Sequence, residues 1–125
     1  MLSHIPNLKE VFKLTLPFPP SVNGLYGGGS KQQRFPSKAL KAWWLNCVKF
    51  EPLMLDKVYI EYGFYFPDMR ERDTQNYVKA VTDYMVKQGV IANDSWQNIM
   101  CEVLLPLGLC RENPRVEINI FIAID

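Results

Sequence analysis

The chain of 125 residues is 48% hydrophobic and 22% charged, the composition of an ordinary soluble protein. Its length supports one hydrophobic core, so we expect a single domain over residues 1–125. No apolar run approaches the roughly 20 residues that span a bilayer, and the first residues lack the basic start and apolar stretch of a signal peptide. We therefore expect a cytoplasmic protein without a membrane partner. The three cysteines and the one histidine lack the closely spaced pairs of a zinc site, which predicts free thiols.

The net charge of +1 conceals an uneven distribution along the chain. Residues 11–50 carry six Lys and Arg side chains and no acidic one, whereas the remainder carries eight cations and thirteen acids. On its own, such a cluster is more often a solvated surface. On a chain so close to neutral overall, it also indicates a face that binds a polyanion.

The first half of the chain begins with a predicted strand over residues 11–16, where apolar and polar residues alternate. The run Pro17-Phe18-Pro19-Pro20 ends this strand, because proline cannot donate to the ladder. Residues 21–36 contain four glycines and are predicted to form a long loop, of a length that usually has a function or is disordered. Ser37 is the predicted N-cap of a helix that runs to about Phe50. Its apolar side consists of Leu40, Trp43, Trp44 and Cys47, and we expect both tryptophans in the core or at an interface rather than as base-stacking platforms.

The second half alternates cleanly over residues 57–66, which predicts a strand that ends at Pro67-Asp68. A second helix is predicted from Thr74 or Gln75 to Gln88, with Gly89 as its stop. Further strands are predicted near residues 99–105 and over residues 116–124. The polar stripe of the second helix, at spacings of three and four, consists of Asn76, Lys79, Asp83 and Lys87.

These elements follow one another in the order β-α-β-α-β-β. This order predicts an α+β fold with a mixed β-sheet and with the helices packed on one face of the sheet.

The segment most informative about chemistry runs from residue 67 to residue 79 and joins a strand to the second helix. A second acidic turn, Asn93-Asp94-Ser95, follows that helix. By ordinary local rules Asp73 is a helix N-cap, Lys79 and Asp83 form a surface ion pair, and Asp94 is a turn residue. Whether Asp73 and Asp94 meet within one chain or across a dimer is left open by the sequence.

The same residues resemble the RusA family of Holliday-junction resolvases, in the right order and at similar spacing over most of the chain. The segment from Leu16 to Asn23, followed by Tyr26, resembles the N-terminal signature of the family. The arginine-bearing turn and Asp73-x-x-Asn76-x-x-Lys79 resemble the central signature Asp-x-Asp-Asn-x-x-Lys, and Asp83 falls on the acidic position that follows. Asn93-Asp94-Ser95 resembles the Asp-Asp-Ser element.

The resemblance implies a RusA-like homodimer that resolves four-way DNA junctions by paired nicks, in recombination and repair in a bacterial or phage-infected cell. It implies a Mg²⁺ cofactor, with Mn²⁺ as a substitute, held by Asp73 and Asp94 and by Gln75 at a third ligand position. Asp73, Lys79 and Asp94 would be catalytic, with Lys79 stabilising charge on the phosphate. Asn76, Asp83 and Asn93 would support the site. The expected DNA-binding residues are Asn23, Tyr26, Lys31, Arg34, Lys38, Lys41, Arg70 and Arg72.

Two departures from the family pattern weaken the implied metal site. Gln75 and Asn93 stand where the family has aspartates, so two carboxylates become neutral amides and Mg²⁺ affinity is expected to fall. Two alternatives therefore accompany the nuclease hypothesis. The first is a junction-binding dimer with weakened catalysis. The second is a phage protein repurposed to bind another protein. Such a protein would bind its partner tightly and would show no salt-sensitive affinity for junction DNA.

Overall fold

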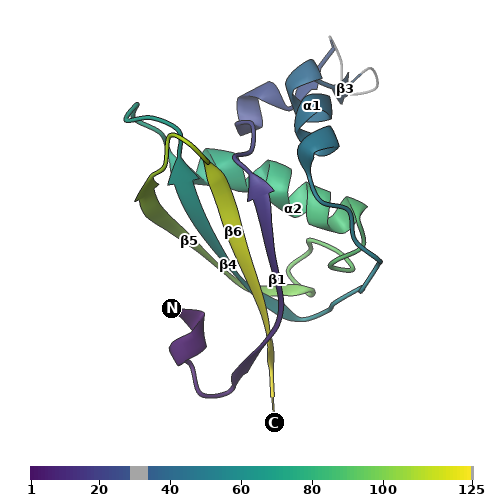
Figure 1. Cartoon of the computed structure of the whole chain (residues 1–125). Coiled ribbons are helices and arrows are strands. Elements are labelled where there is room, and N and C mark those ends of the chain that lie inside the picture. The colour runs from purple at the N-terminus through teal and green to yellow at the C-terminus, as the bar shows by residue number, and fades with distance from the viewer. Residues whose placement is uncertain (29–33, 125) are drawn as a thin grey trace.

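The computed structural model describes residues 1–28 and 34–124. Its main sheet contains four strands, β1 (Leu8–Pro17), β4 (Val58–Phe66), β5 (Ile99–Leu109) and β6 (Arg115–Ala123), in the spatial order β1-β6-β4-β5. β6 pairs antiparallel with both β1 and β4, whereas β4 pairs parallel with β5. The helices α1 (Lys38–Asn46) and α2 (Val78–Lys87) lie on one face of this sheet (Figure 1). The predicted α+β fold with a mixed sheet is confirmed.

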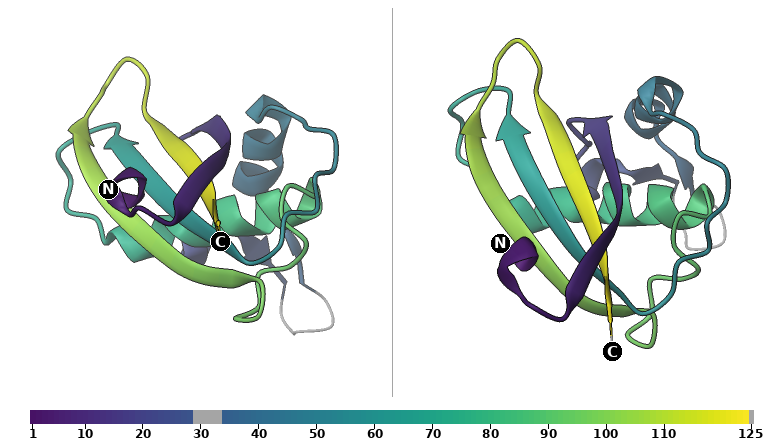
Figure 2. Two further views of the ribbon diagram at one scale, coloured as in Figure 1. Left: turned by 90° about the horizontal axis from the view of Figure 1, so that it is seen from below. Right: turned by 60° about the horizontal axis from the view of Figure 1, so that its bottom comes forward.

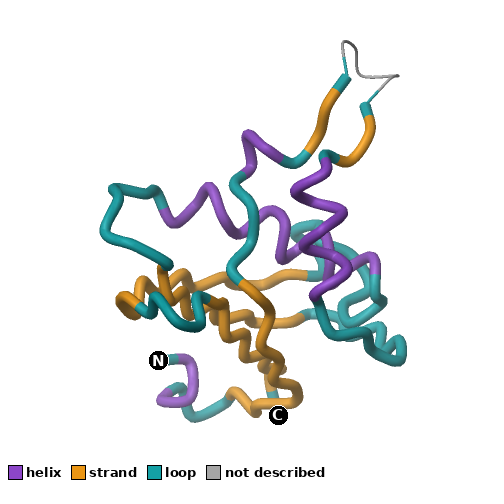
Figure 3. The backbone as a smooth tube through the Cα atoms, turned by 45° about the horizontal axis from the view of Figure 1, so that its top comes forward, coloured by secondary structure: helices purple, strands orange, loops and turns teal. Residues whose placement is uncertain are grey.

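The core lies between the sheet and the two helices, which form separate layers in Figure 3. Alternate residues of β4 point into this core, as their period-2 pattern predicts. Four of them are fully buried, namely Val58, Ile60, Tyr62 and Phe64. The helices contribute Leu40, Trp43, Ala80, Val81, Tyr84 and Met85 to the same core. In the described part of the chain, no helix has the length and apolarity to cross a membrane.

A buried polar contact joins α2 to the centre of the sheet. The hydroxyl of Tyr62 donates to the Glu102 carboxylate at 2.7 Å and lies 2.9 Å from the hydroxyl of Thr82 on α2. Burial, reinforced by the charge of Glu102, raises the pKa of Tyr62 well above its usual value. The tyrosine therefore stays a neutral hydrogen-bonding group that fixes the position of α2 over β4.

The opposite face of the sheet is partly covered by the N-terminal 3₁₀ turn η1 (Leu2–His4). Leu2 is buried, and its backbone N–H donates to Glu61 of β4 at 3.0 Å. Both views in Figure 2 place η1 and α2 on opposite sides of the sheet. As a result β4 is buried on both faces, because Glu61 and Gly63 are buried as well as the core-facing residues.

Several predicted boundaries were wrong. α1 ends at Asn46 rather than near Phe50, because Cys47 turns to an extended conformation and buries its side chain. β5 continues to Leu109 instead of ending near Leu105. Its Pro106 is compatible with a strand here because β5 lies at the sheet edge. The second helix opens with a 3₁₀ turn, η4 (Thr74–Tyr77), before α2 begins.

The predicted loop over residues 21–36 contains structure at both of its ends. It includes the 3₁₀ turn η2 (Val22–Gly24) and a small hairpin of β2 (Tyr26–Gly27) and β3 (Phe35–Pro36). Ser37 is the N-cap of α1, as predicted, since its hydroxyl accepts from the backbone N–H of Leu40 at 3.1 Å. The same hydroxyl donates to the Gly24 carbonyl at 2.6 Å, and the buried Leu25 anchors the hairpin in the core.

Gly89 stops α2 as predicted and offers a test of the fold. Its φ is +73°, and a Cβ there would lie 2.9 Å from the Cβ of Pro52. We expect Gly89→Ala to lower the free energy of unfolding by about 1–3 kcal/mol, because both strain and a clash oppose alanine. Urea denaturation measures this change. The control is Gly24→Ala, where an added Cβ meets nothing within 4 Å and the change should stay within about 0.5 kcal/mol. Equal destabilisation by the two variants would contradict this account of Gly89.

Candidate functional site

The outward face of α2 borders a groove that contains several of the residues singled out in the sequence. Lys79 lines this groove, of about 390 Å³, with residues from the segment after β1 and from the small hairpin. The remaining lining residues are Val22, Asn23, Leu25, Tyr26 and Arg34. Residues about fifty positions apart therefore meet in one concave surface, which we call the Lys79 groove.

Lys79 is held as a cation in the groove. Its ammonium donates to the Asp83 carboxylate at 2.9 Å, one helical turn further along α2. This hydrogen bond is the main cause that raises the pKa of Lys79, and the charges of Asp83 and Asp94 add to it. At neutral pH Lys79 is therefore an ammonium group, suited to stabilise negative charge and unsuited to act as a base.

Asp94 lies on the segment that returns from α2 to β5, and the residues before β4 hold this segment. Leu55 forms a parallel bridge with Ile91, and Asn98 donates to the Asp56 carboxylate. Within the turn itself, the side chain of Asn93 accepts from the Ser95 backbone N–H at 3.2 Å. Asn93 thus shapes the turn that carries Asp94.

The segment 67–98, which joins β4 to β5 and which we call the crossover, carries Asp73 as the N-cap of η4. Its carboxylate accepts from the backbone N–H of Gln75 at 3.2 Å, and its carbonyl accepts from the N–H of Asn76 at 3.0 Å. Asp73 and Gln75 are both exposed. Asp73 is thus the N-cap that local rules predict. Because its carboxylate is also exposed, it is accessible to a ligand.

The expected Mg²⁺ ligands do not amount to a preformed site. Within residues 1–28 and 34–124, no three or more His, Cys, Asp or Glu side chains gather where they could hold a metal ion. Asp73, Gln75 and Asp94 supply at most two carboxylates and one amide oxygen. Mg²⁺ commonly takes one or two carboxylates and completes its shell with water and substrate phosphates. The donor set is thus too small for a dedicated protein cage, and a bound ion would have to complete its shell with water and with substrate phosphate.

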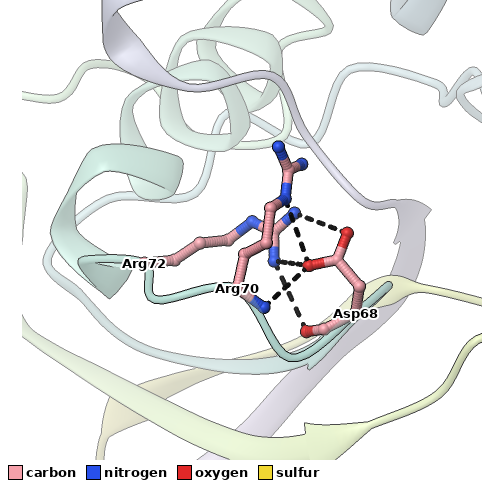
Figure 4. Close-up of polar contacts among 3 residues, drawn as sticks. All are labelled: Asp68, Arg70 and Arg72. Atoms are coloured by element: carbon pink, nitrogen blue, oxygen red, sulfur yellow. Dashed lines mark hydrogen bonds and ion pairs between the residues drawn. The ribbon is translucent and has the colours of Figure 1, made fainter.

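A second charged cluster, shown in Figure 4, lies in the turn between β4 and η4. Arg72 donates to both carboxylate oxygens of Asp68, at 2.6 and 3.1 Å, and Arg70 donates to one of them at 3.3 Å. The hydrogen bonds from Arg72 are the main cause that holds the pKa of Asp68 well below its usual range. Only 8% of the Arg72 side chain is exposed, against 77% for Arg70.

Arg72 also packs on Phe18, which follows β1. Its guanidinium lies 5.8 Å from the Phe18 ring centre, and that ring lies 5.0 Å from the ring of Tyr77 in η4. Arg72 was expected to bind DNA, but its guanidinium is occupied in fixing this turn. Neither Asp68 nor Phe18 was singled out for such a role. The sequence does contain a signal for this ion pair, because Asp68 lies just after a predicted strand and four residues before Arg72.

The other expected DNA-binding residues are spread over the surface. Lys38 and Lys41 are exposed on α1, and Arg70 is exposed at the start of the crossover. Lys31 lies outside the described residues. Two residues without an assigned role form a contact between α1 and α2. The ammonium of Lys87 on α2 lies 3.6 Å from the ring centre of Trp44 on α1. Lys87 belongs to the polar stripe recognised in the sequence, but nothing there placed Trp44 beside it.

The Asp68 cluster predicts a specific dependence of stability on pH. Because the pKa of Asp68 is lowered in the folded state, its contribution is present above the pKa of an unfolded aspartate, about 3.9, and is lost below it. We expect Asp68→Asn to be less stable than wild type at pH 7, with the two free energies of unfolding converging towards pH 2. Chemical denaturation across this range measures the difference, with Glu51→Gln as a control for loss of one exposed carboxylate. A constant gap between wild type and Asp68→Asn at all pH values would refute the ion pair.

Comparison with known proteins identifies the family to which the chain belongs. Residues 30–121 match the family model described as endodeoxyribonuclease RusA, which covers well over half of the 125 residues. No curated protein shows significant similarity to the chain. The matched range includes α1, β4, β5, β6 up to residue 121, and the crossover that carries Asp73, Lys79 and Asp94. The chain therefore belongs to the RusA family of endodeoxyribonucleases.

Proposed function

We propose that this protein is a structure-specific endodeoxyribonuclease that resolves four-way DNA junctions in recombination and repair. Family membership supports the reaction class. The observation that carries the proposal is the Lys79 groove, where Lys79 meets Asn23, Tyr26 and Arg34 and lies within electrostatic reach of Asp94. Two segments that resemble the family signatures thus line one groove, and the charge of Asp94, on a third, acts on the ammonium of Lys79.

The groove suits a phosphodiester backbone. Lys79 and Arg34 are cations in a concave surface, and Asn23 and Tyr26 add polar hydrogen-bonding groups. Such contacts provide affinity for the backbone without reading the base sequence. The ammonium of Lys79, oriented by Asp83, would stabilise the charge that builds on the phosphate during cleavage. If about six phosphates are neutralised, the logarithm of the binding constant should fall against that of the salt concentration with a slope near −5.

Recognition of a junction requires more than one copy of the groove. We propose a homodimer of single-domain subunits, because a two-fold dimer matches the two-fold symmetry of paired nicks on a four-way junction. Light scattering of the purified protein, with and without junction DNA, reports the oligomeric state.

Cleavage is proposed to need Mg²⁺ or Mn²⁺, as the family resemblance implies. Asp73 and Asp94 would be the carboxylate ligands, and the amide of Gln75 is the remaining candidate donor. Hard oxygen ligands of this kind suit either ion. The ion would activate water and neutralise charge on the phosphate.

A junction-binding protein with weakened cleavage is the second candidate. Gln75 and Asn93 favour it, since both are neutral where the family has carboxylates, and the side chain of Asn93 is engaged within its own turn. This candidate keeps the groove and its affinity for DNA while it loses turnover.

The first test is cleavage of a labelled four-way junction with Mg²⁺ or Mn²⁺, beside a matched linear duplex. We expect paired nicks on the junction, no product with Asp73→Asn, and a loss of about 100-fold or more with Lys79→Met. Lys9→Met, an exposed lysine of β1, should keep wild-type cleavage. Salt-sensitive binding without nicks would favour the second candidate. Absence of both binding and cleavage would refute a nucleic-acid function and favour a protein partner.

The second test restores a carboxylate. Gln75→Asp should raise Mg²⁺ affinity and junction cleavage by about tenfold, because it returns one negative charge to the candidate ligand set. Calorimetric titration with Mg²⁺ and the nicking assay measure the two effects. Asn7→Asp makes the same amide-to-carboxylate change before β1 and should have no effect. An unchanged Mg²⁺ affinity in Gln75→Asp would contradict the assignment of position 75 as a ligand.

A further inference from the structure

A second pocket, which we call the Trp44 pocket, lies beside the Lys79 groove. It has a volume of about 240 Å³, and its floor is formed by Leu25, Leu40 and Ala80, all almost fully buried. Its remaining lining residues are Tyr26, Pro36, Trp44, Asp83 and Lys87. Leu25 and Tyr26 line both hollows, so the pocket and the groove adjoin each other beside α2.

The lining of the Trp44 pocket combines three features. Two aromatic side chains, Trp44 and Tyr26, border an apolar floor, and the charged residues among the described lining, Asp83 and Lys87, both belong to α2. With Lys79 already paired to Asp83, the ammonium of Lys87 is the additional cation there. A flat, apolar ring attached to an anion matches this arrangement, because the ring can stack while its anion meets the cation.

From these features we propose that the Trp44 pocket binds one unpaired nucleobase of the DNA whose backbone occupies the Lys79 groove. The inference rests on the proposed function. Nucleobases are flat, and any of the four can stack on an aromatic side chain. Each base is joined through its sugar to a phosphate of the backbone. Because the pocket shares Leu25 and Tyr26 with the Lys79 groove, a nucleotide of that same strand is favoured over an unrelated small molecule.

Lys87 occupies the face of Trp44 in the free protein, with its ammonium 3.6 Å from the ring centre. A base that stacks on Trp44 displaces this ammonium, which then meets the phosphate of the same nucleotide. The exchange replaces one cation–π contact by stacking and by a charge-assisted hydrogen bond.

The pocket also provides selectivity for branched DNA. In a continuous duplex both faces of a base are stacked, and removing a base from the stack costs free energy. At a branch point, or in a single strand, an unstacked base is available at a lower cost. The Trp44 pocket therefore binds unpaired nucleotides next to the backbone in the groove and disfavours uninterrupted duplex.

The test compares binding of single-stranded oligodeoxythymidine and of a matched duplex by wild type and variants. Lys87→Met and Trp44→Leu should each weaken single-strand binding by about tenfold, with a much smaller effect on duplex binding. Lys9→Met is the matched control for loss of an exposed lysine and should bind both DNAs as wild type does. Lys87 is exposed, so its variant keeps the test valid if Trp44→Leu folds poorly.

A second readout uses the indole N–H signals of the three tryptophans in ¹⁵N-labelled wild-type protein. Single-stranded DNA should shift the signal of Trp44 and leave that of Trp43, which is buried and donates to the Pro17 carbonyl at 2.8 Å. Binding of single-stranded DNA without a shift of Trp44, or with unchanged affinity in Lys87→Met, would overturn the pocket and leave the proposed function intact. If wild type binds a four-way junction but not single-stranded DNA, the pocket is overturned and the proposed function stands. If wild type binds none of the three DNAs, the proposed function fails, and this inference with it.

Discussion

Parallel pairing of β4 with β5 is the constraint on which the arrangement of the site depends. Two parallel neighbours cannot be joined by a tight turn, so the chain must cross over the sheet with a dozen or more residues. Here the crossover spans residues 67–98 and contains η4 and α2. The whole expected catalytic and supporting set lies on this one crossover: Asp73, Gln75, Asn76, Lys79, Asp83, Asn93 and Asp94. The sheet thus fixes where the chemistry-bearing segment begins and where it returns.

Three sets of contacts hold the crossover in place. At its start Arg72 bridges Asp68 and Phe18, and at its return Asn98 bonds to Asp56. Between these two sites, the hydroxyl of Tyr62 on β4 forms a hydrogen bond with the hydroxyl of Thr82 and so holds α2 against the sheet. Because these sets tie the crossover to the segment after β1, to the segment before β4 and to β4 itself, α2 is held in position and orientation, as a preorganised binding surface requires.

The groove and the pocket are composite surfaces. One wall belongs to the crossover. The other belongs to the segment between β1 and α1, held by the buried Leu25 and by the double role of Ser37, and in the pocket also to α1 itself. The cationic third of the chain therefore faces a helix whose stripe alternates Lys79, Asp83 and Lys87. This apposition explains why a chain of net charge +1 can still offer a local site for a polyanion.

Local features of the sequence were enough to establish much of the architecture. The alternation in residues 57–66 and 116–124, the cap at Ser37 and the stop at Gly89 were all recognised, because each depends on the backbone or burial of a few neighbouring residues. The family-like segments also identified Lys79 as the residue on which to centre the site.

Long-range packing decided the rest. It inserted β6 between β1 and β4, extended β5 through Pro106 and ended α1 at the burial of Cys47. It also brought Asn23, Tyr26 and Arg34 against Lys79, paired Arg72 with Asp68, and placed Trp44 under Lys87. None of these follows from periodicity, since a repeat reports which face of an element is buried but not which distant element covers it. The contacts depend on how the sheet and helices pack together, and this is fixed only when the whole chain has folded.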